Sequence, residues 1–101
     1  MKERNLSHIF KALGDETRLK IVEMLSCGEL CACDILTSFQ ITQPTLSYHM
    51  KILTECSLVR AKKEGSWMKY QNNQDVVDEV MQYWGKIQQA QEDCICKEIG
   101  K

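Results

Sequence analysis

The stretch that decides the fold is Thr42-Gln-Pro-Thr-Leu-Ser-Tyr-His-Met50. Thr42 is a favourable residue for the start of a helix, and Pro44 is tolerated in the first turn because an N–H there has no helical partner. Apolar residues then recur at helical spacing and predict a buried stripe. The members of this stripe are Leu46, Met50 and Leu53.

A second face of the same helix is polar. Gln43, Ser47 and Lys51 follow one another at intervals of four residues and combine hydrogen-bonding groups with a cation. Such a face suits base edges and phosphates in a major groove, so we predict a DNA-recognition helix. The residues expected to contact DNA from this helix are Gln43, Thr45, Ser47, Tyr48, His49 and Lys51. For His49, packing against a neighbouring helix is the alternative.

Three further helices are predicted upstream. Residues 6–13 have an amphipathic pattern that ends at Gly14. Asp15 can cap a second helix, with Leu19 among its inward-facing residues, and Gly28 stops it. A short third helix is expected over residues 31–39.

A β-hairpin and a last helix are predicted downstream. Residues 58–63 and 67–71 are short strand-like runs around a glycine turn, and an apolar helical stripe begins at Val77. The expected fold is mainly α with a β-hairpin: a winged helix-turn-helix with three helices before the recognition helix and one after the hairpin. We expect a single domain over residues 1–101, with a cysteine-containing tail from about residue 92.

Charge is distributed unevenly along the chain. The net charge is −1, but residues 40–71 hold five Lys/Arg against two Glu. A basic stripe on an otherwise acidic molecule is typical of a DNA-contacting surface, although an ordinary solvated hairpin would give the same pattern. The hairpin lysines expected on DNA phosphates are Lys62, Lys63 and Lys69.

The chain has six cysteines, at positions 27, 31, 33, 56, 94 and 96. No apolar run approaches the roughly 20 residues that span a bilayer, and the first residues lead into no signal-peptide apolar region. We therefore expect a cytoplasmic protein with no membrane partner, whose thiols stay reduced. Clustered thiols in that compartment indicate metal binding or redox sensing rather than a disulfide framework.

Cys31 and Cys33 are the first candidates for a soft-metal site. Residues two apart on a regular helix point about 200° apart, so these thiols can share an ion only where the first turn is unwound. Closing both thiolates on one ion would then distort the start of the third helix and shift the recognition helix that packs on it. A ligand that prefers one of two states in this way would release DNA.

Arsenite and antimonite are soft and take three thiolates in a pyramid, and the sequence does not identify the third thiol. Cys27 can approach Cys31 from the preceding turn, or Cys94 or Cys96 can reach it from either chain of a dimer. Cys94 and Cys96 can also form their own soft-metal site or belong to an inert tail. Cys56 is expected to be a small buried residue, and the same role is an alternative for Cys27.

The helices at the two ends of the chain predict a homodimer. Both are strongly amphipathic, and a domain of 101 residues is too small to bury both alone. The residues expected at the dimer interface are Leu6, Ile9, Phe10, Val77, Val80, Met81 and Trp84.

Over nearly its whole length the chain resembles the ArsR/SmtB family of metal-responsive repressors. The resemblance runs from Leu13-Gly-Asp-Glu-Thr-Arg-Leu19 through Gln43-Pro-Thr-Leu-Ser-Tyr-His-Met-Lys-Ile-Leu53 to the hairpin. The string Glu29-Leu-Cys-Ala-Cys-Asp34 resembles the arsenic- and cadmium-responsive branches. The resemblance implies a homodimer, paired through its first and last helices, that represses a resistance operon from an imperfect inverted repeat. It also implies release when As(III) or Sb(III) binds, with no organic cofactor.

The chain departs from the family pattern in three respects. Leu36 stands where many arsenic sensors carry a third cysteine. Residues 74–90 hold no histidine, unlike the final helix of the zinc sensors, and the N-terminal cysteines of the cadmium sensors are missing. The resemblance is therefore to the arsenic-responsive branch, with Cys31 and Cys33 as ligands.

Other functions are compatible with the thiols. Among regulators, the chain could sense Cd(II), Pb(II) or another thiophilic ion, or act as a thiol redox switch. A thiol enzyme is disfavoured because no Cys/His pair with a positioning acid stands in a recognisable order. A metal chaperone would have no need of a basic hairpin. We therefore expect a DNA-binding repressor rather than an enzyme.

Overall fold

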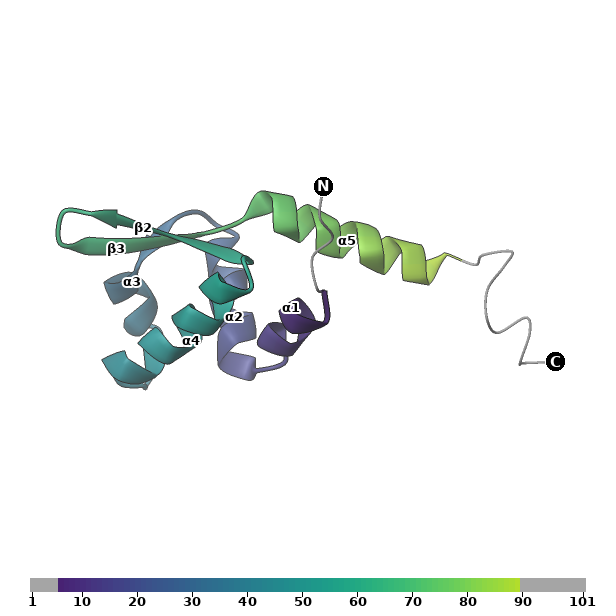
Figure 1. Ribbon diagram of the computed structural model, residues 1–101. Helices are drawn as coiled ribbons and strands as arrows, with labels where there is room; N and C mark the ends of the chain where they lie inside the picture. The colour runs from purple at the N-terminus through teal and green to yellow at the C-terminus, as the bar shows by residue number, and fades with distance from the viewer. Residues whose placement is uncertain (1–5, 90–101) are drawn as a thin grey trace.

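The structure is a computed structural model that describes residues 6–89 (Figure 1). Its helices are α1 Leu6–Leu13, α2 Glu16–Leu25, α3 Ala32–Leu36, α4 Gln43–Glu55 and α5 Gln74–Gln88. Its strands are β1 Leu30–Cys31, β2 Val59–Glu64 and β3 Trp67–Asn72, which form an antiparallel sheet in the order β1-β3-β2. The predicted succession of helices and hairpin is confirmed, and a third strand is added to it.

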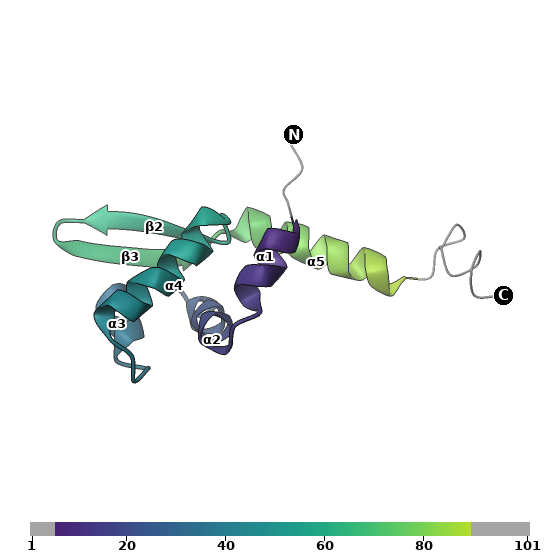
Figure 2. The ribbon, with the colours of Figure 1, turned by 60° about the horizontal axis from the view of Figure 1, so that its bottom comes forward.

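One apolar core joins the helices to the base of the hairpin. Ile21 of α2, Ile35 of α3 and Leu53 of α4 are completely buried in it. Figure 2 shows α4 running from the neighbourhood of α3 to the base of the hairpin, and its residues Leu46, Met50 and Leu53 are buried in the core. The expectation that Leu19 faces inward is wrong, because Ile21 and Leu25 form the inner face of α2 and Leu19 is 54% exposed.

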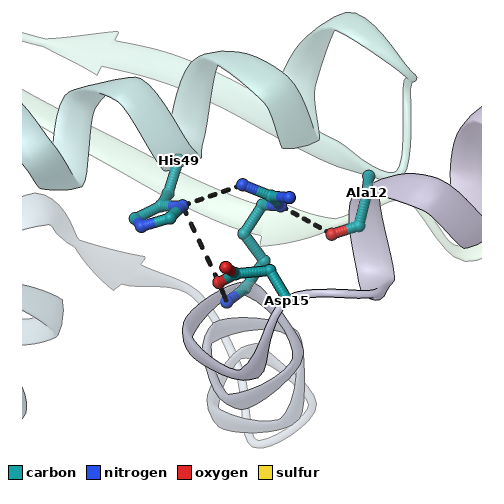
Figure 3. A network of polar contacts seen from close by, with 4 residues as sticks. Ala12, Asp15 and His49 are labelled. Atoms are coloured by element: carbon teal, nitrogen blue, oxygen red, sulfur yellow. Dashed lines mark hydrogen bonds and ion pairs between the residues drawn. The ribbon is translucent and has the colours of Figure 1, made fainter.

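A polar network ties α4 to the α1–α2 corner (Figure 3). The Arg18 Nε donates to the carbonyl oxygen of Ala12 at 2.6 Å, and an Arg18 guanidinium nitrogen lies 3.0 Å from His49 Nδ1. Because arginine can only donate, His49 Nδ1 accepts this bond and the ring carries its proton on Nε2. The separation of 4.0 Å between His49 Nδ1 and an Asp15 carboxylate oxygen is then a close approach to a neutral ring rather than an ion pair.

Asp15 caps α2 as the sequence predicts. Its carboxylate accepts a hydrogen bond from the Arg18 backbone N–H at 3.1 Å. This bond, reinforced by the Arg18 guanidinium, holds the pKa of the Asp15 carboxyl below its ordinary value. The same residue therefore starts α2 and orients the arginine that reaches α4.

The wing consists of β2, β3 and the turn between them. Gly65 in that turn has φ of +62°, a conformation that side chains rarely adopt, so glycine permits the tight reversal. Strand pairing runs from Val59 opposite Asn72 to Glu64 opposite Trp67. Only Val59 of β2 is buried, and the rest of the strand is exposed on both faces.

Strand β1 corrects the predicted third helix. Residues 31–39 were expected to be helical, but Leu30 pairs with Tyr70 and Cys31 pairs with Lys69. The helix is also shorter than expected, because α3 begins at Ala32 and ends at Leu36. The chain therefore enters α3 from a strand that is anchored on the wing.

Helix α5 runs past α1 and extends away from the hairpin (Figure 1). Val76 is its one buried residue in the described range, and α1 lies beside it in both ribbon views. The Phe10 ring of α1 lies 6.1 Å from Tyr83 and 6.4 Å from Trp84, measured between ring centroids. Within residues 6–89, no helix has both the length and the apolar character needed to cross a bilayer.

Candidate DNA-reading surface and thiol site

The polar face of α4 is open to solvent. Thr42 caps the helix by accepting a hydrogen bond from the Thr45 N–H at 3.3 Å, and the residues of the first turn are exposed. The exposed residues on this face are Gln43, Thr45, Ser47, Tyr48 and Lys51. They are the predicted DNA contacts, and the structure brings them together on one accessible helix.

His49 does not belong to this face. It is 9% exposed and points toward α2, where it accepts the hydrogen bond from Arg18. Its assignment as a DNA contact is wrong, because its position on the helix is that of the buried neighbours Leu46, Met50 and Leu53. The alternative of helix packing is confirmed.

The wing lysines have internal partners. Lys62 Nζ lies 3.0 Å from a Glu64 carboxylate oxygen and 3.9 Å from one of Glu29, and Lys69 Nζ lies 3.1 Å from Glu64. Hydrogen bonds from Lys62 and Lys69 lower the pKa of the Glu64 carboxyl, and the same bonds raise the pKa of both lysines. Much of the wing's positive charge is therefore neutralised locally. Lys63 is exposed, and no ion pair is found for it among residues 6–89.

The thiols of Cys31 and Cys33 come together at the junction of β1 and α3. Cys31 precedes the helix with extended backbone angles (φ −84°, ψ 161°), so the angular separation of a regular helix does not apply to the pair. The two sulfurs and a carboxylate oxygen of Asp34 all lie within 4.8 Å of one another. The predicted unwinding of a helical turn is therefore unnecessary, since the strand already places Cys31 outside the helix.

Local hydrogen bonds shape this group. The Asp34 carboxylate accepts a weak bond from the Cys31 N–H at 3.4 Å, which holds the acid across the start of α3. A hydrogen bond to the Cys31 sulfur raises the pKa of the Cys33 thiol, and the negative charges nearby add to the effect. Both effects favour the protonated form of the Cys33 thiol.

The wing forms the other wall of the thiol site. A pocket of about 390 Å³ is lined by Glu29, Cys31, Cys33, Asp34, Trp67 and Lys69. Lys69 was predicted to contact DNA phosphates, and the sequence gives no sign that Trp67 borders the thiols. The pairing of Cys31 with Lys69 brings β3 to the thiols. A strand of two residues has no sequence pattern from which this pairing could be predicted.

The other cysteines are separate from this group in the described part of the chain. Cys27 is exposed and is not a member of the cluster. Cys56 is partly buried at the end of α4, where its thiol donates to the Leu53 carbonyl at 3.4 Å, as a packing residue would. Cys94 and Cys96 lie outside the described residues.

The arrangement defines a class of protein. A short helix, an exposed recognition helix and a basic β-hairpin beside it make a winged helix-turn-helix DNA-binding protein. The family model for bacterial regulatory proteins of the arsR family matches residues 15–61. The chain belongs to the ArsR family of bacterial regulatory proteins, so it is a DNA-binding transcriptional regulator and not an enzyme.

Individual relatives agree with this assignment. The chain is 46% identical to an arsenical resistance operon repressor of Staphylococcus aureus over 98% of its own length and 95% of the relative's. A Bacillus subtilis repressor of the same description is 40% identical over 74% of this chain and 72% of that protein. Among solved structures, an ArsR-like regulator from a Rhodococcus species superposes with a TM-score of 0.71 at 26% identity, covering 81% of this chain and 77% of that one.

Replacing Glu64 by Gln should tighten DNA binding. Loss of the carboxylate frees Lys62 and Lys69 for phosphates, so the logarithm of affinity should fall more steeply with the logarithm of salt, by up to about 0.9 for each added contact. Fluorescence anisotropy with labelled operator across a salt series measures this slope.

The control is Glu55→Gln, which makes the same change in charge at the C-terminal end of α4. Its salt slope should stay at the wild-type value. Equal steepening in both variants would mean that net charge alone, and not the release of wing lysines, is responsible.

Proposed function

We propose that this chain represses an arsenical-resistance operon and leaves its operator when As(III) or Sb(III) binds Cys31 and Cys33. The observation that carries the proposal is the pair of thiols assembled between α3 and the wing. The relatives described as arsenical resistance operon repressors support it over nearly the full chain. The proposed partner is double-stranded operator DNA with an imperfect inverted repeat.

The donor set suits a soft trivalent ion. Thiolates are soft ligands that favour thiophilic ions, whereas the oxygen of Asp34 is a hard donor and binds arsenic poorly. The described residues thus supply two good ligands, from Cys31 and Cys33. A third thiolate from Cys94 or Cys96 of either protomer, or a water-derived oxygen, would complete a pyramidal shell.

The two thiols belong to different elements, which gives the ligand a route to DNA. Cys31 is on β1, whose partner β3 is half of the wing, and Cys33 is on α3. Helix α3 shares the core with α4 through Ile35 and Leu46. An ion bound by both sulfurs therefore couples the wing to the helix-turn-helix. It favours one position of the wing relative to these helices, as ligand-driven release requires.

Cys31→Ser and Cys33→Ser should each bind operator normally yet fail to release it when arsenite is added. The serine hydroxyl fits the same space but stays protonated and hard, so it cannot replace a thiolate on a soft ion. Neither thiol lies on the exposed face of α4, so DNA affinity should survive. Gel-shift titrations with arsenite measure release directly.

Cys27→Ser is the matched control, because it removes an exposed thiol outside the group. It should release operator at wild-type arsenite concentrations. Release of both Cys31→Ser and Cys33→Ser by arsenite would refute the proposed ligands, and release of the wild type by diamide without metal would favour a redox switch.

Arsenite and a divalent cation differ in their proton balance at this site. The raised pKa of the Cys33 thiol keeps it protonated at neutral pH, so Cd(II) must displace protons and should bind more weakly as the pH falls. Arsenous acid brings hydroxyl groups that leave as water with those protons, so its affinity should change little. Calorimetric titrations on either side of neutral pH compare the two; equally steep pH dependence would contradict binding of neutral arsenous acid.

We also propose a homodimer that pairs through α1 and α5. The outer face of α5 exposes large apolar side chains: Met81 is 66% exposed, Trp84 59% and Ile87 54%. An apolar stripe of this kind on a regulator this small indicates a protein–protein contact. Leu6, Phe10, Val77 and Val80 flank it as partly buried residues, whereas Ile9, 1% exposed, packs in the core of its own chain and is removed from the predicted interface.

Sedimentation equilibrium should give twice the chain mass of 11.7 kDa. Trp84→Glu should shift this mass to the monomer and weaken operator binding, because a charge in an apolar contact is costly. Leu19→Glu places the same charge on an exposed apolar position of α2 and should remain dimeric. A wild-type monomer at micromolar concentration would rule out this interface.

A further inference from the structure

Trp67 is a large aromatic side chain that belongs neither to the core nor to the proposed dimer interface. It is 55% exposed and lies at the start of β3, beside the turn of the wing. Side chains two apart on a strand share one face, so Trp67 lies on the same face as Lys69. Lys69 in turn stands opposite Cys31, and both wing residues line the thiol pocket.

The described thiol group leaves one position of a trivalent arsenic atom without a sulfur. Cys31 and Cys33 supply two, and the nearest third donor is the carboxylate of Asp34. A carboxylate is an unfavourable partner for a soft centre. The pocket around the two sulfurs has an indole as its large apolar wall, while the Lys69 ammonium is held at 3.1 Å by Glu64.

We propose that Trp67 sets the ligand preference of this site, by packing against the carbon substituent of a monosubstituted organic trivalent arsenical. This rests on the proposed function and adds a specificity-determining residue to the same site. A compound of this type needs only two thiolates, which is the number that the described residues bring together. Its third substituent is apolar, and the pocket of about 390 Å³ has room for an aryl ring beside the indole. Trp67 is then a specificity-determining residue, separate from the two ligands.

The binding step balances without any oxidant or reductant. With phenylarsine oxide, two As–S bonds replace the bonds to oxygen, and the oxygen leaves as water with the two thiol protons. Arsenic stays trivalent and the As–C bond stays intact. With arsenite and the same two thiols, two hydroxyl groups leave as two water molecules and a third hydroxyl remains on arsenic, where it gains nothing from an aromatic wall.

The test compares phenylarsine oxide with arsenite on the full-length chain by calorimetric competition. Trp67→Ala should weaken phenylarsine oxide binding by about fivefold, the loss expected for one aromatic contact, and leave arsenite binding unchanged. Trp67→Phe should keep most of the affinity. Met68→Ala is the matched control, because it removes the adjacent side chain on the opposite face of β3 and should alter neither ligand.

A spectroscopic readout is independent of affinity. In a Trp84→Phe chain, Trp67 is the remaining tryptophan. Phenylarsine oxide should change its emission more strongly than arsenite does. Both measurements are repeated in a Cys94→Ser/Cys96→Ser chain, so that each ligand has the same two sulfurs available; phenylarsine oxide binding should be the same as in the wild type.

Three results would overturn the inference: equal loss of both ligands in Trp67→Ala, no loss of either, or no emission change on binding phenylarsine oxide. Failure of the proposed function has a different signature. If Cys31→Ser still binds both ligands with wild-type affinity, the thiol site itself is misassigned. If Cys31→Ser loses both ligands while Trp67→Ala binds like the wild type, the thiol site stands and only the role of Trp67 fails.

Discussion

The pairing of Leu30 and Cys31 with β3 is the contact on which the rest of the site depends. A helix that began one turn earlier would point the two thiols to opposite sides. Two extended residues remove Cys31 from the helix and carry its sulfur to the beginning of α3, within 4.8 Å of the Cys33 sulfur and the Asp34 carboxylate. The same pairing brings the wing against the thiols, so one short strand both builds the thiol group and joins it to the wing.

A second constraint acts on the recognition helix from the opposite side. Arg18 reaches from α2 to the Ala12 carbonyl and to His49, so three helices meet at one guanidinium group. Buried polar groups of this kind hold geometry because an unpaired partner is costly. The predicted recognition helix α4 is therefore held by the hydrogen bond to His49 and by the apolar core along its buried stripe, and its polar face stays exposed.

The parts of the fold that local chemistry determines could be predicted from the sequence. Asp15 and Thr42 mark helix starts through their own side chains, and Gly65 marks the turn of the wing. The errors concern contacts between distant residues. His49 is buried because of an arginine 31 positions earlier, and Cys31 is extended because of a partner 38 positions later. Trp67 enters the thiol pocket through that same register, which no periodicity reveals.

The wing's own acid has a consequence for how the protein finds its operator. A regulator must choose one site among a vast excess of other sequences, and unspecific attraction to phosphates lengthens its stay on the wrong ones. Glu64 holds Lys62 and Lys69 at about 3 Å, as a built-in counterion would. If these lysines contact phosphates as the sequence predicts, DNA must first displace this acid, which reduces the free energy gained from nonspecific contacts. The net charge of −1 likewise adds no attraction to phosphates over the molecule as a whole.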